Sequence, residues 1–151
     1  MRNLLFALTA FLATAVLTGC PSPSNPPIPN GKFNATIDGH NWTATNISSN
    51  DYTSANGRTF SIYARNVSDK QLSITFFNLK QAGAYPIIQN ATGSDTVSCA
   101  AVSYYVTYLA DQVASGQIIV TNVTGTSVAG TFAFTTLAGV NITDGIFNIT
   151  R

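Results

Sequence analysis

The chain has 151 residues, and only 9% of them carry a charge. Seven Lys and Arg side chains face six acidic side chains, all of them Asp, and the cations are scattered along the chain. Proteins that bind nucleic acid need a basic patch or stripe, so we expect no nucleic-acid partner. The length suits a single domain with its own hydrophobic core.

The first twenty residues have the organisation of a secretory signal. Met1–Asn3 is positively charged, and the run 4–17 that follows is almost wholly apolar. A helix over this run measures about 21 Å, short of a bilayer core of about 30 Å. Residues 17–20, Leu-Thr-Gly-Cys, resemble the lipobox of bacterial lipoproteins, whose cysteine is acylated as the signal is removed. We therefore expect residues 1–19 to be a lipoprotein signal peptide and Cys20 to carry the lipid.

Residues 20–30 are expected to be the lipidated cysteine and a proline-rich tether. Five of the six prolines lie here, and such a segment extends without packing. We therefore expect the protein to contact the membrane only through the lipid on Cys20. Pro21 stands where an aspartate retains many lipoproteins at the inner membrane, so the sequence predicts the outer membrane. The tether lacks the acidic run used for surface export, so we expect the domain to face the periplasm.

Residues 31–151 are expected to form one β domain. Phe33, Ala35 and Ile37, for example, alternate with polar residues. Such alternation indicates half-buried antiparallel strands. The short links between them favour an all-β fold, an up-and-down antiparallel meander of about eight strands that forms a flattened barrel or two-layer sandwich. The expected strands are 32–38, 42–48, 58–66, 71–78, 97–109, 116–123, 127–137 and 144–150.

Turn-forming residues separate these strands. We expect turns at 38–39, 55–57, 68–69, 93–95, 124–125 and 144–145, because Asn-Gly, Asp-Gly and similar pairs tolerate positive φ. Leu72, Phe76 and Leu79 also fit helical spacing, but the β-rich composition favours a strand there. The segment from Leu109 to Ser115 is compatible with a single helical turn. The expected core includes Phe33, Ile37, Trp42, Phe60, Ile62, Ile74, Phe132, Phe134 and Phe147.

Motifs at both ends of this domain resemble a known family. Residues 35–44 fit the pattern A-x-I-D-G-x-x-W-x-A, residues 128–134 fit V-x-G-T-F-x-F, and residues 143–147 fit T-x-G-x-F. These motifs resemble those of a family of uncharacterised lipoproteins from Gram-negative bacteria. The resemblance implies a single β domain behind a lipobox. It implies no activity and supplies no functional residue.

Residues able to support catalysis or bind a metal are sparse. His40 is the only histidine; it stands beside Asp38 in an expected turn, and the chain has no Gly-x-Ser-x-Gly elbow. One histidine and Cys99 supply too few ligands for zinc, and the six Asp are dispersed rather than clustered as calcium requires. We predict no catalytic, metal-binding or cofactor-binding residue, and a protein that is not an enzyme. Cys99 is expected to be a small buried hydrophobe.

The sequence favours a lipid-anchored envelope protein with a binding or scaffolding role, and it leaves two alternatives open. A lipocalin-like barrel that carries a small ligand requires an enlarged apolar cavity. A surface module for a glycan or an envelope protein requires several aromatic rings on one exposed patch. The aromatic residues considered for a ligand surface, or for packing in the core, are Trp42, Tyr52, Tyr63, Tyr85, Tyr104, Tyr105 and Tyr108.

Overall fold

The structure, a computed structural model, describes residues 31–54, 57–89, 91, 98–107 and 109–151. These residues form ten β-strands, which confirms the expected all-β class. No helix in this part of the chain is long and apolar enough to span a membrane. The strands are β1 (Lys32–Ile37), β2 (His40–Thr43), β3 (Asn46–Ser54), β4 (Gly57–Arg65), β5 (Lys70–Phe77), β6 (Gly83–Pro86), β7 (Cys99–Val106), β8 (Leu109–Val123), β9 (Ser127–Thr136) and β10 (Asn141–Thr150).

The strands form one curled antiparallel sheet. Its order is β2-β1-β10-β9-β8-β7-β5-β4-β3, and β6 pairs with β8 off this path. Most strands therefore pair with their neighbours along the chain, as the expected meander requires. β1 also pairs with β10, so the first and last strands lie side by side. The two end strands of this order, β2 and β3, are not paired with each other in the described part of the chain, and this agrees with the expected flattened barrel or sandwich.

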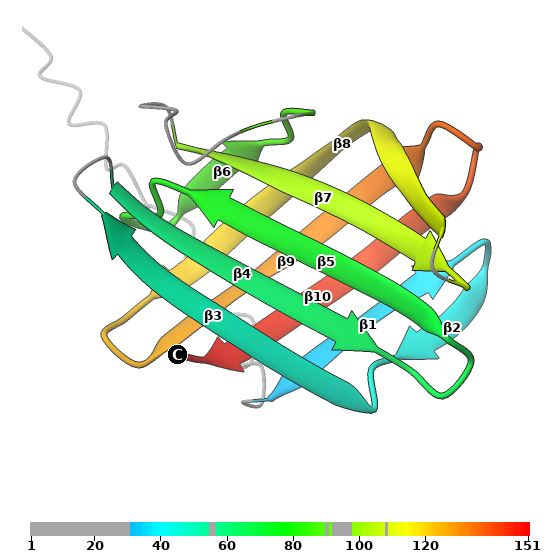
Figure 1. Ribbon diagram of the computed structural model, residues 1–151, viewed down its shortest axis with the longest axis horizontal. Helices are drawn as coiled ribbons and strands as arrows, with labels where there is room; N and C mark the ends of the chain where they lie inside the picture. The colour runs from blue at the N-terminus through cyan, green and yellow to red at the C-terminus, as the bar shows by residue number, and fades with distance from the viewer. Residues whose placement is uncertain (1–30, 55–56, 90, 92–97, 108) are drawn as a thin grey trace, which may run out of the picture.

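Figure 1 shows the sheet flattened into two layers. β3, β4, β5 and β7 lie in front of β1, β10 and β9, and the strands of the two layers cross steeply. β8 belongs to both layers, because Leu109–Gln112 pair with β7 and the residues from Val113 onward pair with β9. Its register shifts between Val113 and Ser115. A Cβ on Gly116 would collide with Phe134, so glycine permits the close approach where the strand bends.

Phenylalanine rings fill the space between the layers. The ring centroids of Phe33 and Phe132 are 5.1 Å apart, and those of Phe76 and Phe147 are 5.8 Å apart. All nine residues expected in the core are buried, and Cys99 is buried too, as expected. Close packing of this kind is typical of a protein interior. The space between the two layers is therefore filled by core side chains. An internal ligand site would need a cavity there.

The expected strand 42–48 is wrong, because the chain changes layers within it. The Ala44 N–H donates to the Phe33 carbonyl of the back layer, whereas the Thr45 N–H donates to the Arg65 carbonyl of the front layer. This crossover ends β2 and begins β3. The helical turn considered for Leu109 to Ser115 is also wrong, because that segment pairs with strands on both sides of the bend in β8.

Two further differences concern short features. The four-residue strand β6 was not expected from the sequence, and only Tyr85 in it is buried. Asp144-Gly145 forms a bulge inside β10 rather than a turn, because the register with β9 shifts between Ile142 and Gly145. An Asp-Gly pair suits either feature, since both use positive φ. The turns at 38–39, 68–69 and 124–125 are confirmed, while residues 55–56 and 93–95 lie outside the described residues.

Candidate functional site

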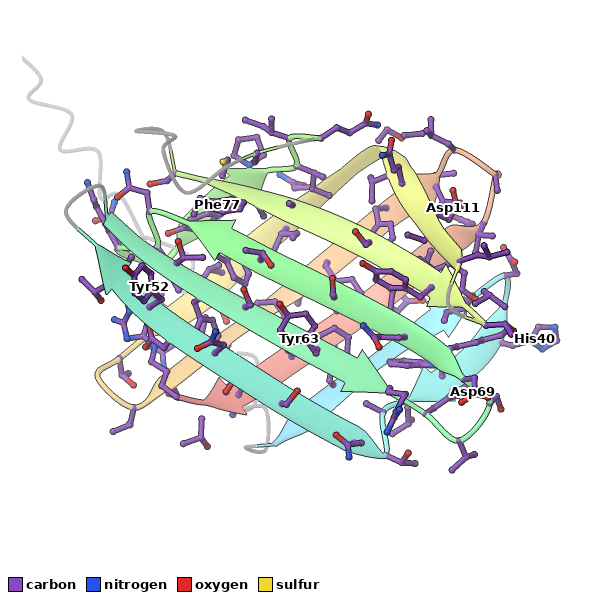
Figure 2. The ribbon with its side chains drawn as sticks, in the orientation of Figure 1. His40, Tyr52, Tyr63, Asp69, Phe77 and Asp111 are labelled. Carbon is purple, nitrogen blue, oxygen red and sulfur yellow. The ribbon has the colours of Figure 1, made fainter. Side chains whose placement is uncertain are left out.

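The outer face of the front layer gathers most of the exposed aromatic side chains. Phe60, Ile62, Leu72 and Ile74 point into the core, so the residues that alternate with them point outward. We call this outward surface the tyrosine face. Figure 2 shows Tyr52, Tyr63 and Phe77 spread across it. Its members include Asn50, Tyr52, Thr59, Ser61, Tyr63, Arg65, Gln71, Ser73, Thr75, Phe77, Ala101, Ser103 and Tyr105.

Strand register arranges the tyrosine face in rows. Arg65 lies opposite Gln71, and Gln71 lies opposite Tyr105, so these three side chains cross β4, β5 and β7 in one row. The next row is Tyr63, Ser73 and Ser103. Small serines beside large tyrosines leave the rings standing above their surroundings. Tyr52 is 64% exposed and Tyr63 is 43% exposed, so solvent or a ligand can reach both rings.

A depression of about 270 Å³ lies at one end of this face. Arg65, Asp69, Gln71 and Tyr105 line it. Asp69 is placed by the β4–β5 turn, where it adopts a φ of 54°. The Asn66 side chain holds that turn, because its Oδ1 accepts the N–H of Ser68 at 3.0 Å and that of Lys70 at 3.3 Å. The depression thus offers a guanidinium, an amide and a phenol from three strands, and a carboxylate from a turn with defined geometry.

Hydroxyl groups occupy the middle of the tyrosine face. The Ser61 and Thr75 hydroxyls are 3.1 Å apart and share a hydrogen bond. Ser61 and Ser73 are almost covered by their larger neighbours. Hydroxyls donate and accept hydrogen bonds, and the surface around them combines flat rings with groups of both polarities. This arrangement can bind a ligand by ring contact and hydrogen bonding, and it places no nucleophile beside a histidine.

The structure divides the aromatic residues considered in the sequence. Trp42 is buried and meets Phe33 edge-on at 6.1 Å between centroids. Tyr85 is also buried; its ring lies edge-on to Phe76, and its hydroxyl donates to the Gln81 carbonyl at 2.8 Å. Both serve the core. Tyr52, Tyr63 and Tyr105 lie on the tyrosine face, Tyr104 lies at a different groove, and Tyr108 is outside the described residues.

The other candidates from the sequence have structural positions. His40 is exposed at the end of the molecule (Figure 2) and begins β2. The carboxylate of Asp38 accepts the N–H of Asn141 at 2.8 Å, which joins the β1–β2 turn to the start of β10. Within the described residues, no group of three or more His, Cys, Asp and Glu side chains could hold a metal. Cys20 lies outside the described residues.

One ion pair lies away from the tyrosine face, on the inner side of β3 and β4. The guanidinium of Arg58 pairs with the carboxylate of Asp51, and its Nε donates to Oδ1 at 2.8 Å. This hydrogen bond lowers the pKa of Asp51 against the opposing effect of burial. The Arg151 guanidinium stands 5.7 Å from the centroid of the Phe60 ring. These contacts close the edge of the sandwich near the end of β10.

One protein-family model matches most of the chain. Residues 29–149 match the family model described as a domain of unknown function, DUF6252. The chain belongs to the DUF6252 family. No curated protein and no solved structure matches this chain. Membership in DUF6252 agrees with the expected relation to an uncharacterised domain family.

Three residues of the depression in this DUF6252 domain were not predicted from the sequence: Arg65, Asp69 and Gln71. A signal for two of them was present. Arg65 and Gln71 flank the expected turn at 68–69 and fall on the polar positions of their strands, so a hairpin places them near each other. Tyr105 joins them only because β7 pairs with β5. The order of the strands was needed for that step.

Proposed function

We propose that this protein is a lipid-anchored, non-catalytic binding protein of the cell envelope, and that the tyrosine face binds a glycan. The observation that carries the proposal is the row of Arg65, Gln71 and Tyr105 beside the exposed ring of Tyr63. Aromatic rings with a polar tip suit ligands that are apolar on one side and wet on the other. Sugar rings have this character, with C–H groups on their faces and hydroxyls at their edges.

The spacing of the rings favours an extended ligand. Tyr63 and Tyr105 are separated by two strand spacings across the sheet and by two residues along the strands. This corresponds to about 12 Å between their Cα atoms. Tyr52 and Tyr63 are one strand and four residues apart, or about 14 Å. Rings with this spacing suit a ligand longer than a single sugar ring. A chain of several sugars can contact them in turn while its hydroxyls meet Arg65, Asp69 and Gln71.

The anchoring half of the proposal rests on the sequence. A lipid on Cys20 would hold the protein on a membrane, and stable anchoring takes more than one acyl chain. The proline-rich tether would separate the domain from that membrane by about 30 Å. We propose the outer membrane and a domain that faces the periplasm, where envelope glycans lie within reach.

Glycan binding is tested with the purified lipoprotein in non-ionic detergent. Peptidoglycan sacculi, and soluble polysaccharides in affinity electrophoresis, serve as probes. We expect binding to at least one probe, with Tyr63→Ala and Tyr105→Ala each weakening it about tenfold, which corresponds to about 1.4 kcal/mol. Tyr85→Phe is the matched control, because Tyr85 is buried away from this face. Binding that survives both alanine substitutions would place the site elsewhere.

Lipid anchoring is tested separately by Cys20→Ser. We expect wild-type protein in the outer-membrane fraction and the variant in the soluble fraction. A variant that stays in the membrane as fully as the wild type would contradict the anchor. Protease treatment of intact cells tests the orientation, because rapid digestion would show display on the cell surface instead of the periplasmic side.

A further inference from the structure

A second concave surface lies at the end of the sandwich, between the β7–β8 turn and the β9–β10 turn. It is a groove of about 500 Å³, which is within the usual range of small-molecule sites. Asp111 marks this end of the molecule in Figure 2. We call it the end groove. Its lining includes Tyr104, Val106, Leu109, Asp111, Ala138 and Val140.

Both walls of the end groove are held by hydrogen bonds. The Asp111 carboxylate accepts the N–H of Ala138 at 3.3 Å, and the Leu137 N–H donates to the Gln112 carbonyl at 2.8 Å. The N–H of Val140 donates to the Thr136 hydroxyl at 3.1 Å. The first two bonds link β8 to the β9–β10 turn. The groove is therefore part of the folded framework and is formed before any ligand arrives.

Large apolar side chains surround the end groove without being covered. Leu109 is 77% exposed, and Val106 and Leu137 are exposed as well. The lining is mostly apolar, with Ala138 and Val140 on the opposite wall. Burying apolar surface contributes about 25 cal/mol per Å², and an exposed cluster of this kind marks an interaction site. The groove thus favours a ligand with an apolar body.

Tyr104 gives the groove a polar point. Its side chain is only 3% exposed, yet it lines the groove. A phenol hydroxyl both donates and accepts hydrogen bonds, so a polar head group on a ligand can bind to it.

The charges near Tyr104 select the sign of that head group. Asp111 is in the lining, which contains no Lys, Arg or His among the described residues. Burial raises the pKa of the Tyr104 phenol first, and the carboxylates of Asp38 and Asp111 raise it further. Lys70 lies opposite Val106 on β5 and is not among the lining residues. Among the described residues, the charged side chain of the lining is the Asp111 carboxylate, which favours a cationic head group.

We infer that the end groove binds a small amphiphilic amine. The apolar body would lie against Val106, Leu109 and Val140. The protonated amine would donate hydrogen bonds to the Asp111 carboxylate and to the Tyr104 oxygen, as charged donors do with carboxylates. This site is separate from the tyrosine face and does not depend on glycan binding.

The position of the groove leaves it open to such a ligand. β1 begins at Lys32, which pairs with Asn148, and ends at Ile37, which pairs with Ile142. The groove lies near the Ile37 end, because the N–H of Asp38 donates to the Asn141 carbonyl just beyond the β9–β10 turn. Lys32 lies at the other end of the same strand, so the start of β1 is remote from the groove.

A matched pair of probes tests the inference. 2-Phenylethylamine and 3-phenylpropionate have the same phenyl and two-carbon body and opposite head-group charges at pH 7. We expect calorimetric titration of the full lipoprotein in non-ionic detergent to show binding of the amine at least about tenfold tighter than that of the acid. Asp111→Asn should remove most of this preference, and Leu109→Ser should weaken both probes together.

Tyr104→Phe keeps the ring and removes the hydroxyl, so it should weaken the amine several-fold while the melting temperature stays close to that of the wild type. Tyr63→Ala is the control, because it removes a ring from the tyrosine face and should leave amine binding unchanged. Equal binding of both probes, no binding of the amine, or an unchanged preference in Asp111→Asn would each overturn the inference. Loss of amine binding in Tyr63→Ala would also overturn the separation of the two sites.

Discussion

Phe132 offers the sharpest test of the packing between the two layers. Its ring lies 5.1 Å from that of Phe33, 6.0 Å from that of Phe134 and 6.4 Å from that of Phe147, measured between centroids. The residue is 3% exposed. Phe132→Ala removes the centre of this cluster and leaves a cavity that the strands cannot close. Such a truncation costs about 3–5 kcal/mol, out of a total stability of about 5–15 kcal/mol for a domain.

The cost converts into a melting temperature. Residues 31–151 make a domain of 121 residues. At about 2.1 cal/mol/K per residue, its unfolding entropy is about 0.25 kcal/mol/K. A loss of about 4 kcal/mol therefore lowers the melting temperature by about 16 °C. Thermal unfolding followed by circular dichroism measures this shift directly.

His40→Ala is the control for this experiment. His40 is exposed at the start of β2, and surface substitutions usually change stability by less than about 0.5 kcal/mol. Its melting temperature should therefore stay within about 2 °C of the wild type. The face assignment would be refuted if Phe132→Ala melted with the wild type while His40→Ala melted far below it. His40 would then have to be treated as part of a site.

Two further predictions concern a close approach and a surface ion pair. A Cβ on Gly130 would meet the carbonyl oxygen of Ile119 and the ring of a neighbouring phenylalanine, so Gly130→Ala should destabilise the fold by about 1–3 kcal/mol. A Cβ on Gly125 would meet open space, so Gly125→Ala should leave the chemical denaturation midpoint unchanged. The Asp51 pKa is lowered by the hydrogen bond from Arg58, so the pair stabilises the folded state above the ordinary carboxyl value of 3.8 and loses that effect as the pH falls below it. Because the pair is partly exposed, its effect on the free energy of unfolding should be under about 1 kcal/mol. Asp51→Asn should flatten the dependence of stability on pH between about 5 and 2. An unchanged slope of stability against pH would show that the pair contributes nothing.

Alternation along the strands was enough to predict the core. Phe60 and Ile62 are two residues apart, and in a sheet with one buried face such residues point the same way. Each strand carries this information by itself, so the burial of Phe33, Phe134 and Phe147 required no knowledge of the strand order. Short links between strands likewise predicted the meander, because successive antiparallel strands pair most easily with each other.

Local sequence gave no signal where tertiary pairing made the decision. The segment 42–48 has no Gly or Pro at Ala44–Thr45, and the strand ends there only because the chain crosses from one layer to the other. Asp144-Gly145 has the sequence of a turn, and it forms a bulge because β9 pairs with the residues on both sides of it. In both places the local sequence permits more than one conformation, and pairing with the neighbouring strand determines which one forms.

Tyr104 and Tyr105 show the same division at the candidate sites. Adjacent residues in a strand point to opposite faces, so the sequence by itself determined that these two side chains separate. It did not determine which one is buried, because the two residues are identical in chemistry. Pairing of β7 with β5 places Tyr104 beside Leu72 and Tyr105 beside Gln71. Only the closure of the sheet places Tyr104 at the end groove and Tyr105 on the tyrosine face, because the burial of a side chain depends on which layer lies opposite its face of the strand.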